Sequence, residues 1–374
     1  MTAQSAASVT ARAAVLRETG GKFKIEDVTV APPRADEVLV RMVGVGVCHT
    51  DMVCRDGFPI PLPMVLGHEG SGVVEAVGEN VKRVKPGDHV VLSFNSCGQC
   101  PSCTDHHPAT CTQFLGMNFA GVRLNDGSTP LSQDGKPVHS IFFGQSSFAT
   151  YAIAREINTV PVPKNVPLEI LGPLGCGIQT GAGAAINSMK VGPKDSIVVF
   201  GGGSVGLSAV MGAKAMDAKT IIVVEPNAER RALAKQLGAT HAFDPRDGSD
   251  VVAAIKEATG GGVRYAIDTT GIPPVIKQAL DSVAPGGKLG LIGMSPPDAA
   301  IPATLMDLAI KSVTLQPIIE GDADPQAFIP KMIELYQAGK FPFDKLITKF
   351  PFDQINEASH ASETGAAIKP VLVF

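Results

Sequence analysis

The sequence lacks any long apolar run, because no segment of its 374 residues approaches about 18 uninterrupted apolar positions; no membrane span is expected. The first ten residues, MTAQSAASVT, lack a basic region followed by an apolar stretch, so we expect a short loose tail rather than a secretory signal, and a cytoplasmic protein. Basic residues are not in excess: 32 Lys and Arg against 36 Asp and Glu give a net charge of −4. That balance disfavours nucleic acid or an anionic membrane as a partner.

Charged residues are also few, at 18% against 44% apolar residues, which is typical of a globular protein. The length favours two domains. Cysteines number seven, and an odd count in a chain without secretory features makes a disulfide framework unexpected. Metal binding or catalysis is the better expectation for the cysteines.

The pattern of the chain changes near residue 180. Before it, short Val- and Gly-rich runs separated by turn signals predict a mostly β domain. From SIVVFG (196–201) to about residue 319, short apolar runs alternate with helical patterns, which predicts βαβ units and a parallel sheet. The remaining segment, 320–374, holds a helical stretch and ends in the strand-like KPVLVF, and we expect it to return to the first domain.

The stretch VVFGGGSVG places Gly201, Gly203 and Gly206 in GxGxxG spacing between a predicted strand and a predicted helix. This context predicts a dinucleotide site in which Gly201 permits the turn, Gly203 admits a pyrophosphate and Gly206 allows close helix packing. Glu225, at the end of the next strand, would accept hydrogen bonds from ribose and disfavour a 2′-phosphate, so NAD is expected. Arg230 lies nearby on the helix that follows. A plain strand–turn–helix without ligand is the alternative.

Four cysteines lie within fifteen residues in C-x2-C-x2-C-x7-C spacing: Cys97, Cys100, Cys103 and Cys111. Four thiolates predict a closed, structural zinc site. An iron–sulfur cluster and a zinc-ribbon nucleic-acid module are weaker alternatives. The nearby His106 and His107 are interpreted as solvated loop residues.

Three further candidates, Cys48, His68 and Cys176, are dispersed along the chain. Two thiolates and one imidazole would form a zinc site with an open fourth position, as catalytic zinc requires. From the residues alone, three unrelated buried side chains remain an equal alternative.

The segment GHEGSGVVEAVGENV resembles the signature of the zinc-containing alcohol dehydrogenases of the medium-chain dehydrogenase/reductase family. The cysteine lobe, GCGIQTG and the nucleotide loop follow in the family's order, so the resemblance covers essentially the whole chain. FFGQSSFATYA and the long lobe around 97–145 are most similar to the benzyl (aryl) and allylic alcohol dehydrogenase branch.

The resemblance implies an α/β protein with two domains. A GroES-like, mostly β catalytic domain would comprise 1–177 and 320–374 and carry the zinc lobe at about 95–113, and a Rossmann coenzyme domain would comprise 178–319. It further implies a catalytic zinc on Cys48, His68 and Cys176 and a structural zinc on the four close cysteines. Homodimers and homotetramers both fit the family.

The resemblance also assigns roles to other side chains. Thr50 would bind the substrate hydroxyl and begin a proton relay, Asp51 would orient the ring of His68, and Glu69 would lie behind the zinc. Val205 and Thr180 would lie at the nicotinamide. The candidate substrate pocket comprises Ser93, Phe142, Phe143, Ile178, Ile318 and Ile319.

The sequence departs from well-known relatives at Val53, where they carry the histidine that ends the relay. We hypothesise that His49 contacts the pyrophosphate and also serves the relay; water completing the relay is the alternative. Cys54 belongs to neither cluster and is interpreted as a small buried hydrophobe.

The expected reaction is the reversible, NAD-dependent oxidation of primary aryl or allylic alcohols, of the benzyl alcohol or geraniol type, to aldehydes. A glutathione-linked formaldehyde dehydrogenase and a general alkyl alcohol dehydrogenase are alternative enzymes. A non-catalytic NAD-binding or zinc-ribbon interaction protein is an alternative of another class.

Overall fold

The computed structural model describes residues 7–374, and the chain divides into two compact units. Unit 1 comprises the chain up to Gly177 with Asp324–Pro330 and Asp344–Phe374, and unit 2 comprises Ile178–Ala323 and Lys331–Phe343. We expected all of 320–374 in the first domain, whereas residues 320–323 and Lys331–Phe343 group with unit 2. There the rings of Tyr336 and Phe343 lie 4.8 Å apart, and Phe343 is buried. Of the predicted loose tail, residues 1–6 lie outside the described residues, whereas Val9 and Thr10 belong to a strand and pair with Val30 and Thr29.

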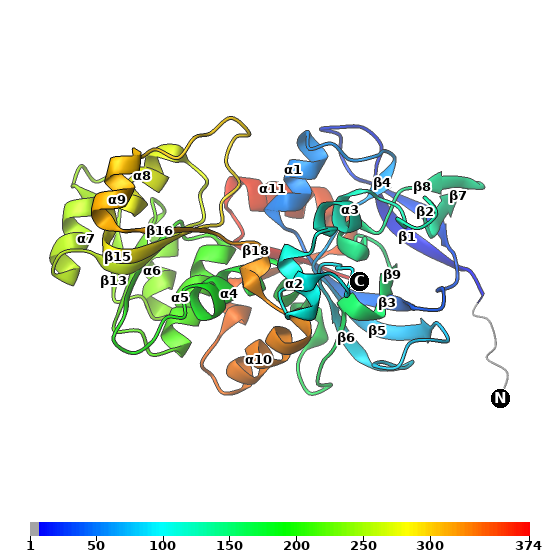
Figure 1. Cartoon of the computed structure of the whole chain (residues 1–374). Coiled ribbons are helices and arrows are strands. Elements are labelled where there is room, and N and C mark those ends of the chain that lie inside the picture. The colour runs from blue at the N-terminus through cyan, green and yellow to red at the C-terminus, as the bar shows by residue number, and fades with distance from the viewer. Residues whose placement is uncertain (1–6) are drawn as a thin grey trace. The chain divides into compact units, whose positions relative to one another are not determined.

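Unit 1 contains two sheets (Figure 1). The first has the strand order β4-β1-β2-β7-β8, with β1 Val9–Leu16, β2 Lys24–Val30, β4 Met64–Val65, β7 Leu131–Gln133 and β8 Lys136–Val138. The second has the order β10-β6-β5-β3-β18-β17, and β9 also pairs with β3. Its strands are β3 Glu37–Gly46, β5 Gly70–Val77, β6 His89–Leu92, β9 Tyr151–Arg155, β10 Thr159–Pro161, β17 Ile347–Pro351 and β18 Lys369–Val373. The C-terminal strand β18 thus completes a sheet begun by the first half of the chain.

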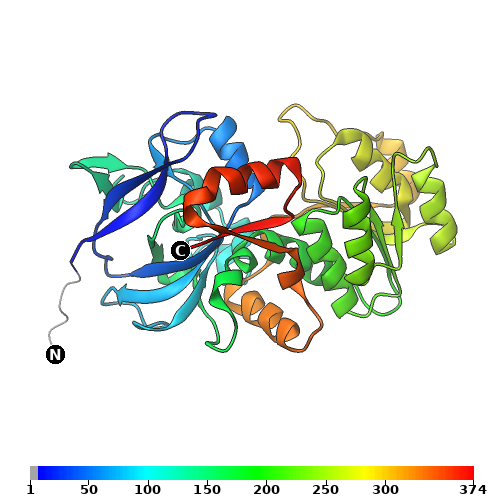
Figure 2. The same ribbon diagram turned by 180° about the vertical axis from the view of Figure 1, so that it is seen from behind.

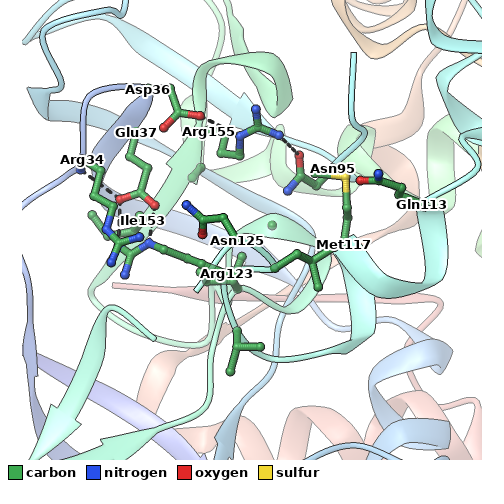
Figure 3. A pocket seen from close by; sticks show the side chains of 15 residues that line it. Arg34, Asp36, Glu37, Asn95, Gln113, Met117, Arg123, Asn125, Ile153 and Arg155 are labelled. Carbon is green, nitrogen blue, oxygen red and sulfur yellow. Dashed lines mark hydrogen bonds and ion pairs between the residues drawn. The ribbon is translucent and has the colours of Figure 1, made fainter. Parts of the chain in front are cut away.

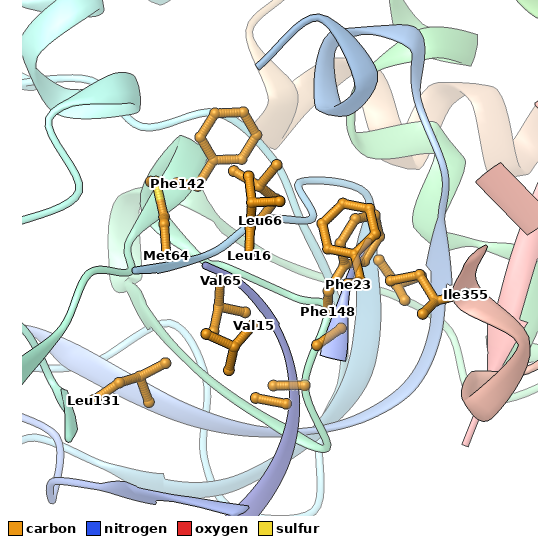
Figure 4. Close-up of a cluster of buried hydrophobic side chains, with 14 of the residues drawn as sticks. Val15, Leu16, Phe23, Met64, Val65, Leu66, Leu131, Phe142, Phe148 and Ile355 are labelled. Atoms are coloured by element: carbon orange, nitrogen blue, oxygen red, sulfur yellow. The ribbon is translucent and has the colours of Figure 1, made fainter. Parts of the chain in front are cut away.

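Short helices connect these strands: α1 His49–Asp56, α2 Pro101–Thr104, α3 Phe114–Phe119 and α11 Ile355–Thr364. The main core of the unit packs β1 and β4 against the aromatic rings of Phe142 and Phe148 and against Ile355 of α11 (Figure 4). Phe142 and Phe148 are fully buried. Burial of a large apolar side chain contributes about 1.5–3 kcal/mol, so this core holds the loops that emerge from it.

Unit 2 is built on a parallel sheet of strand order β13-β12-β11-β14-β15-β16. The strands are β11 Ser196–Phe200, β12 Thr220–Val224, β13 His241–Phe243, β14 Val263–Asp268, β15 Val283–Leu291 and β16 Thr314–Pro317. The order reverses between β11 and β14, which is the Rossmann arrangement, with ligand binding expected at the reversal point. The prediction of an α/β chain with a Rossmann sheet and a mostly β part is confirmed.

The helices of unit 2 are α4 Gly177–Gly183, which begins at the last residue of unit 1, α5 Ser204–Ala215, α6 Ala228–Gln236, α7 Val251–Thr259, α8 Pro273–Ser282 and α9 Leu305–Lys311. A π-helical turn, Ala184–Ser188, continues α4, and α10, Pro325–Gln337, crosses the boundary between the units. Helices α5 and α6 cover one face of the sheet, and α7, α8 and α9 cover the other (Figures 1 and 2). Because both faces are covered, β11 is apolar along nearly its whole length rather than alternating.

Among residues 7–374, no helix is long and apolar enough to cross a membrane.

Candidate functional site

Four adjacent candidate residues, 48–51, lie where strand β3 leads into helix α1. Cys48 is the N-cap of α1, and its backbone N–H donates to Asp51 Oδ2 at 3.0 Å, which fixes the turn between strand and helix. The next residue, His49, is exposed, whereas Asp51 is fully buried. Thr50 is half-buried, and its Oγ1 lies 3.9 Å from Cys48 Sγ. The turn therefore places a hydroxyl beside the thiol.

His68 is held in one orientation by the residues around it. Its Nδ1 lies 2.9 Å from Asp51 Oδ1, which also accepts the backbone N–H of Gly67 at 3.1 Å. Gly67 has φ of +89°, and an added Cβ would lie 2.5 Å from the backbone nitrogen of Phe148, so only glycine fits before this histidine. With Nδ1–H donated to the carboxylate, Nε2 presents its lone pair; Nε2 is buried and has no hydrogen-bond partner among the described residues.

Ligand atoms of Cys48, His68, Glu69 and Cys176 lie within 4.8 Å of one another, and all four residues are buried. The pKa of the Cys48 thiol is lowered, chiefly by a hydrogen bond with Cys176. Burial raises the pKa by less than this, and the charges of Lys369 and His68 lower it further. Two buried cysteine sulfurs and one imidazole nitrogen without a hydrogen-bond partner among the described residues fit a zinc ion.

Glu69 lies against a residue that the sequence reasoning missed. Lys369 Nζ is 2.9 and 3.0 Å from the two carboxylate oxygens of Glu69, and Gly177 N–H donates to Oε1 at 2.9 Å. Burial lowers the pKa of Lys369, but the charges of Glu69 and Cys48 outweigh burial and raise it. The one signal in the sequence was a lysine at the start of the apolar run KPVLVF, and this pattern does not indicate which residue pairs with the lysine.

Gln145 is the second residue that the sequence reasoning missed. Its side chain is buried, and Nε2 donates to the carbonyl oxygens of His68 at 2.9 Å and Ser93 at 3.2 Å. Its Oε1 accepts the backbone N–H of Gly70 at 3.1 Å and the hydroxyl of Ser147. Gln145 therefore fixes the main chain of His68 on one side, while Asp51 fixes its ring on the other.

Two candidate pocket residues, Phe142 and Phe143, contact the His68 ring directly. Phe143 stacks on it with ring centroids 4.5 Å apart and an interplanar angle of 27°, and Phe142 meets it edge-on at 5.4 Å and 82°. The loop that carries them contains left-handed backbone at Ile141, Phe143 and Ser146. Such conformations are costly for bulky residues and persist only where the surroundings enforce them.

The remaining pocket candidates are divided between the units. Ser93, in unit 1, is buried and donates its hydroxyl to the carbonyl oxygen of Gly175 at 2.6 Å. In unit 2, Ile178 and Ile318 are buried, whereas Ile319 is 49% exposed.

The four close cysteines converge in the loop between β6 and α3. Cys103 Sγ lies 3.6 Å from Cys100 Sγ and 3.9 Å from Cys97 Sγ. A tetrahedral zinc with Zn–S bonds of about 2.3 Å places its sulfurs about 3.8 Å apart. Backbone N–H groups of Thr112 and Cys103 lower the pKa of Cys100 to about 5. The spacing of the sulfurs fits a four-thiolate zinc site.

The glycine loop lies between β11 and α5, at the point where the strand order reverses. Gly201 has φ of +100°, and a Cβ on Gly206 would lie 1.9 Å from the carbonyl oxygen of Gly201. Gly203 is the N-cap of α5, and a Cβ there would meet no atom within 4 Å. The loop thus leaves open space at a helix N-terminus, which fits a pyrophosphate.

Glu225 lies beside this loop and is buried. Its Oε2 accepts Gly202 N–H at 2.6 Å, and its Oε1 accepts Asn227 N–H at 2.8 Å. The carboxylate is therefore held at the end of β12 by the backbone on both sides. The backbone N–H of Arg230 donates to Asn227 Oδ1 at 3.1 Å in the first turn of α6.

Two further coenzyme candidates also lie in unit 2. Thr180 is buried on α4, and Val205 is in the first turn of α5. A Cβ on Gly181 would lie 1.9 Å from the carbonyl oxygen of Val205, so the two helices approach closely.

Two protein-family models match the chain. Residues 34–164 match the alcohol dehydrogenase GroES-like domain, and residues 204–338 match the zinc-binding dehydrogenase domain.

Known proteins match over nearly the whole length. The chain is 63% identical to geraniol dehydrogenase of Castellaniella defragrans over 98% of each chain. Among solved structures, a zinc-binding-domain alcohol dehydrogenase protein from Burkholderia ambifaria is 50% identical with a TM-score of 0.96. Benzyl alcohol dehydrogenase from Acinetobacter calcoaceticus is 46% identical with a TM-score of 0.94. Both structural alignments cover 98% of this chain and 99% of the other.

Proposed function

The chain belongs to the zinc-containing alcohol dehydrogenases of the medium-chain dehydrogenase/reductase family, and we propose that it oxidises primary allylic or aryl alcohols reversibly to aldehydes. Zinc and a nicotinamide cofactor belong to this chemistry. The observation that carries the proposal is the buried set of Cys48, His68 and Cys176, with the lone pair of Nε2 unpartnered and a threonine hydroxyl alongside. The 63% identical geraniol dehydrogenase and the benzyl alcohol dehydrogenase structure support the substrate class.

Within this proposal, Cys48, His68 and Cys176 hold the catalytic zinc. When bound, zinc supplies the Lewis acidity that lowers the pKa of the alcohol hydroxyl, and NAD accepts the hydride. Thr50 binds the hydroxyl of the alcohol and receives its proton. Asp51 keeps the His68 ring in the tautomer whose Nε2 faces the metal site.

The transfer of the proton from Thr50 to solvent uses His49 in this proposal. Val53, half-buried in α1, has no group that moves a proton. His49 is adjacent to Thr50 and exposed, so its imidazole is able to exchange a proton with water. We also propose that His49 contacts the pyrophosphate of NAD.

NAD is the proposed coenzyme because of the fixed position of Glu225. Its carboxylate, held by Gly202 and Asn227, would accept the ribose hydroxyls and repel a 2′-phosphate. Gly201, Gly203 and Gly206 would receive the pyrophosphate, with Arg230 nearby, and Thr180 and Val205 would pack at the nicotinamide.

A second zinc is proposed on Cys97, Cys100, Cys103 and Cys111, as a structural ion. The protein is also proposed to form homodimers or homotetramers. Helix α9 supports association because it exposes Leu305 at 86%, Ile310 at 74% and Met306 at 66%.

The test is a kcat/KM panel with NAD over geraniol, cinnamyl alcohol, benzyl alcohol, ethanol and cyclohexanol, on enzyme whose zinc content is measured. Geraniol, cinnamyl or benzyl alcohol should give the highest values, at two zinc ions per chain. Ethanol as the best substrate would overturn the substrate class, and one zinc ion per chain would overturn the two-site assignment.

A further inference from the structure

A cavity of about 250 Å³ lies in unit 1, and its lining contains none of the candidate metal ligands (Figure 3). Met117, Ile141 and Ile153 form apolar parts of its wall, and Asn95, Arg34 and Arg155 form polar parts. A cavity with an apolar part and a few convergent polar groups is the usual form of a small-molecule site.

Asn95 is the buried polar group of this cavity, at 3% exposure. Its Oδ1 accepts Ser96 N–H at 2.9 Å and lies 3.5 Å from Arg155 Nη1, so the orientation of the amide is set. Its Nδ2 therefore points into the cavity (Figure 3) and has no acceptor among the described residues. An amide nitrogen that faces a cavity from a buried residue is able to donate to a ligand oxygen there.

The two arginines also have partners within the protein. Arg155 donates from Nε to Asp36 at 3.0 Å and from Nη1 to the Ser96 carbonyl oxygen at 3.2 Å. Arg34 Nη2 donates to Ser128 Oγ at 2.9 Å and lies 2.9 Å from Asp126 Oδ2. Arg155 and Arg34 both line the cavity, with side chains 33% and 40% exposed. Their guanidinium groups therefore add positive charge to its wall beside the Asn95 amide.

We propose that this cavity binds a small amphipathic carboxylate, such as an aryl or short branched alkenoic acid. Guanidinium and amide N–H groups suit a planar carboxylate, and the apolar wall suits a ring or short chain. The acidic side chains Asp36 and Glu37 also line the cavity. Their charges oppose a doubly charged phosphate far more than a single carboxylate.

The cavity is connected to the candidate active site through one loop. Ile141 and Gly144 line the cavity, and both have left-handed backbone. Between them in the sequence lie Phe142 and Phe143, whose rings contact the His68 ring. A carboxylate in the cavity restrains this loop and thereby changes alcohol oxidation without competing with the alcohol. This kinetic consequence rests on the proposed function, whereas the binding itself does not.

The test uses benzoate as the probe, titrated calorimetrically into zinc- and NAD-loaded enzyme saturated with the non-reacting alcohol analogue trifluoroethanol. Asn95→Asp keeps Oδ1 for Ser96 and replaces the inward N–H with a negative oxygen. Benzoate binding should weaken by about tenfold or more, the scale of one charge-assisted hydrogen bond. Gln354→Glu, exposed in the same unit, is the charge-matched control and should bind as the wild type.

Met117→Trp, which fills the cavity, is the second variant and should abolish the same binding. Benzoate binding that is equal in all variants, or absent from the wild type, overturns the proposed site. In steady-state assays with benzyl alcohol, benzoate should lower kcat in the wild type and not in Met117→Trp. If the enzyme oxidises none of the panel alcohols but benzoate binding still depends on Asn95, the proposed function fails and the site stands.

Discussion

The buried ion pair between Lys369 and Glu69 gives the most demanding prediction about stability. The two side chains are 2% and 0% exposed, and Nζ lies 2.9 and 3.0 Å from the carboxylate oxygens. Lys369→Met removes the ammonium but keeps most of the apolar stem. Among the described residues, Gly177 N–H is then the one hydrogen-bond donor left to the buried Glu69 carboxylate. Removing one partner of a buried pair costs about 3–5 kcal/mol of unfolding free energy.

The assay is thermal unfolding of zinc-loaded enzyme. At about 2–4 °C per kcal/mol for 150–250 residues, the Tm should fall by about 6–20 °C. The matched control is Lys349→Met, because Lys349 Nζ also lies 2.9 Å from a carboxylate, that of Glu169, but the side chains are 49% and 32% exposed. This exposed pair should contribute under about 1 kcal/mol.

Two outcomes would refute this reasoning. One is equal losses of Tm in Lys369→Met and Lys349→Met. The other is a double variant, Lys369→Met with Glu69→Gln, that is no more stable than Lys369→Met alone. Neutralising the carboxylate that has lost its partner should recover stability.

The pH dependence of stability follows from the raised pKa of Lys369. The contribution of the ion pair to the unfolding free energy is fully present below the ordinary lysine pKa and is lost only as pH rises through the raised value.

Three further predictions concern the site itself. Thr50→Val should lower kcat/KM for geraniol by about 100-fold or more, because the group that receives the proton is lost, while Thr50→Ser should retain most activity; equal rates in Thr50→Val and the wild type would exclude this role. His49→Gln should weaken NAD binding and shift the pH profile of alcohol oxidation, and unchanged values of both would leave the relay to water. In zinc-stripped protein at pH 6, iodoacetamide should modify Cys100, whose pKa is lowered to about 5, and spare Cys54, whose pKa is raised by burial; mass spectrometry of the peptides distinguishes the two.

Features that repeat along the chain were predictable from the sequence. The alternation after residue 180 predicted the parallel sheet, because a strand covered on both faces is apolar throughout and a helix has its own period. The C-x2-C-x2-C-x7-C spacing likewise brought four sulfurs together within one loop, where few conformations separate them. The convergence of Cys48, His68 and Cys176 came from the family resemblance, since no local pattern links positions so far apart.

Contacts between side chains and partners far away in the sequence were not predictable. Gln145 lies 77 residues from the His68 carbonyl oxygen that it binds, and Lys369 lies 300 residues from Glu69. Their partners are a backbone group in one case and a carboxylate already assigned to the metal site in the other, so composition and spacing give no sign of either contact. The left-handed backbone at Ile141 and Phe143 was also not predictable from the sequence. Bulky residues disfavour this conformation, and only the folded core around Phe142 and Phe148 enforces it. The four close cysteines were thus predictable from their spacing, whereas the contacts that hold the dispersed candidate ligands in place are defined only by the fold.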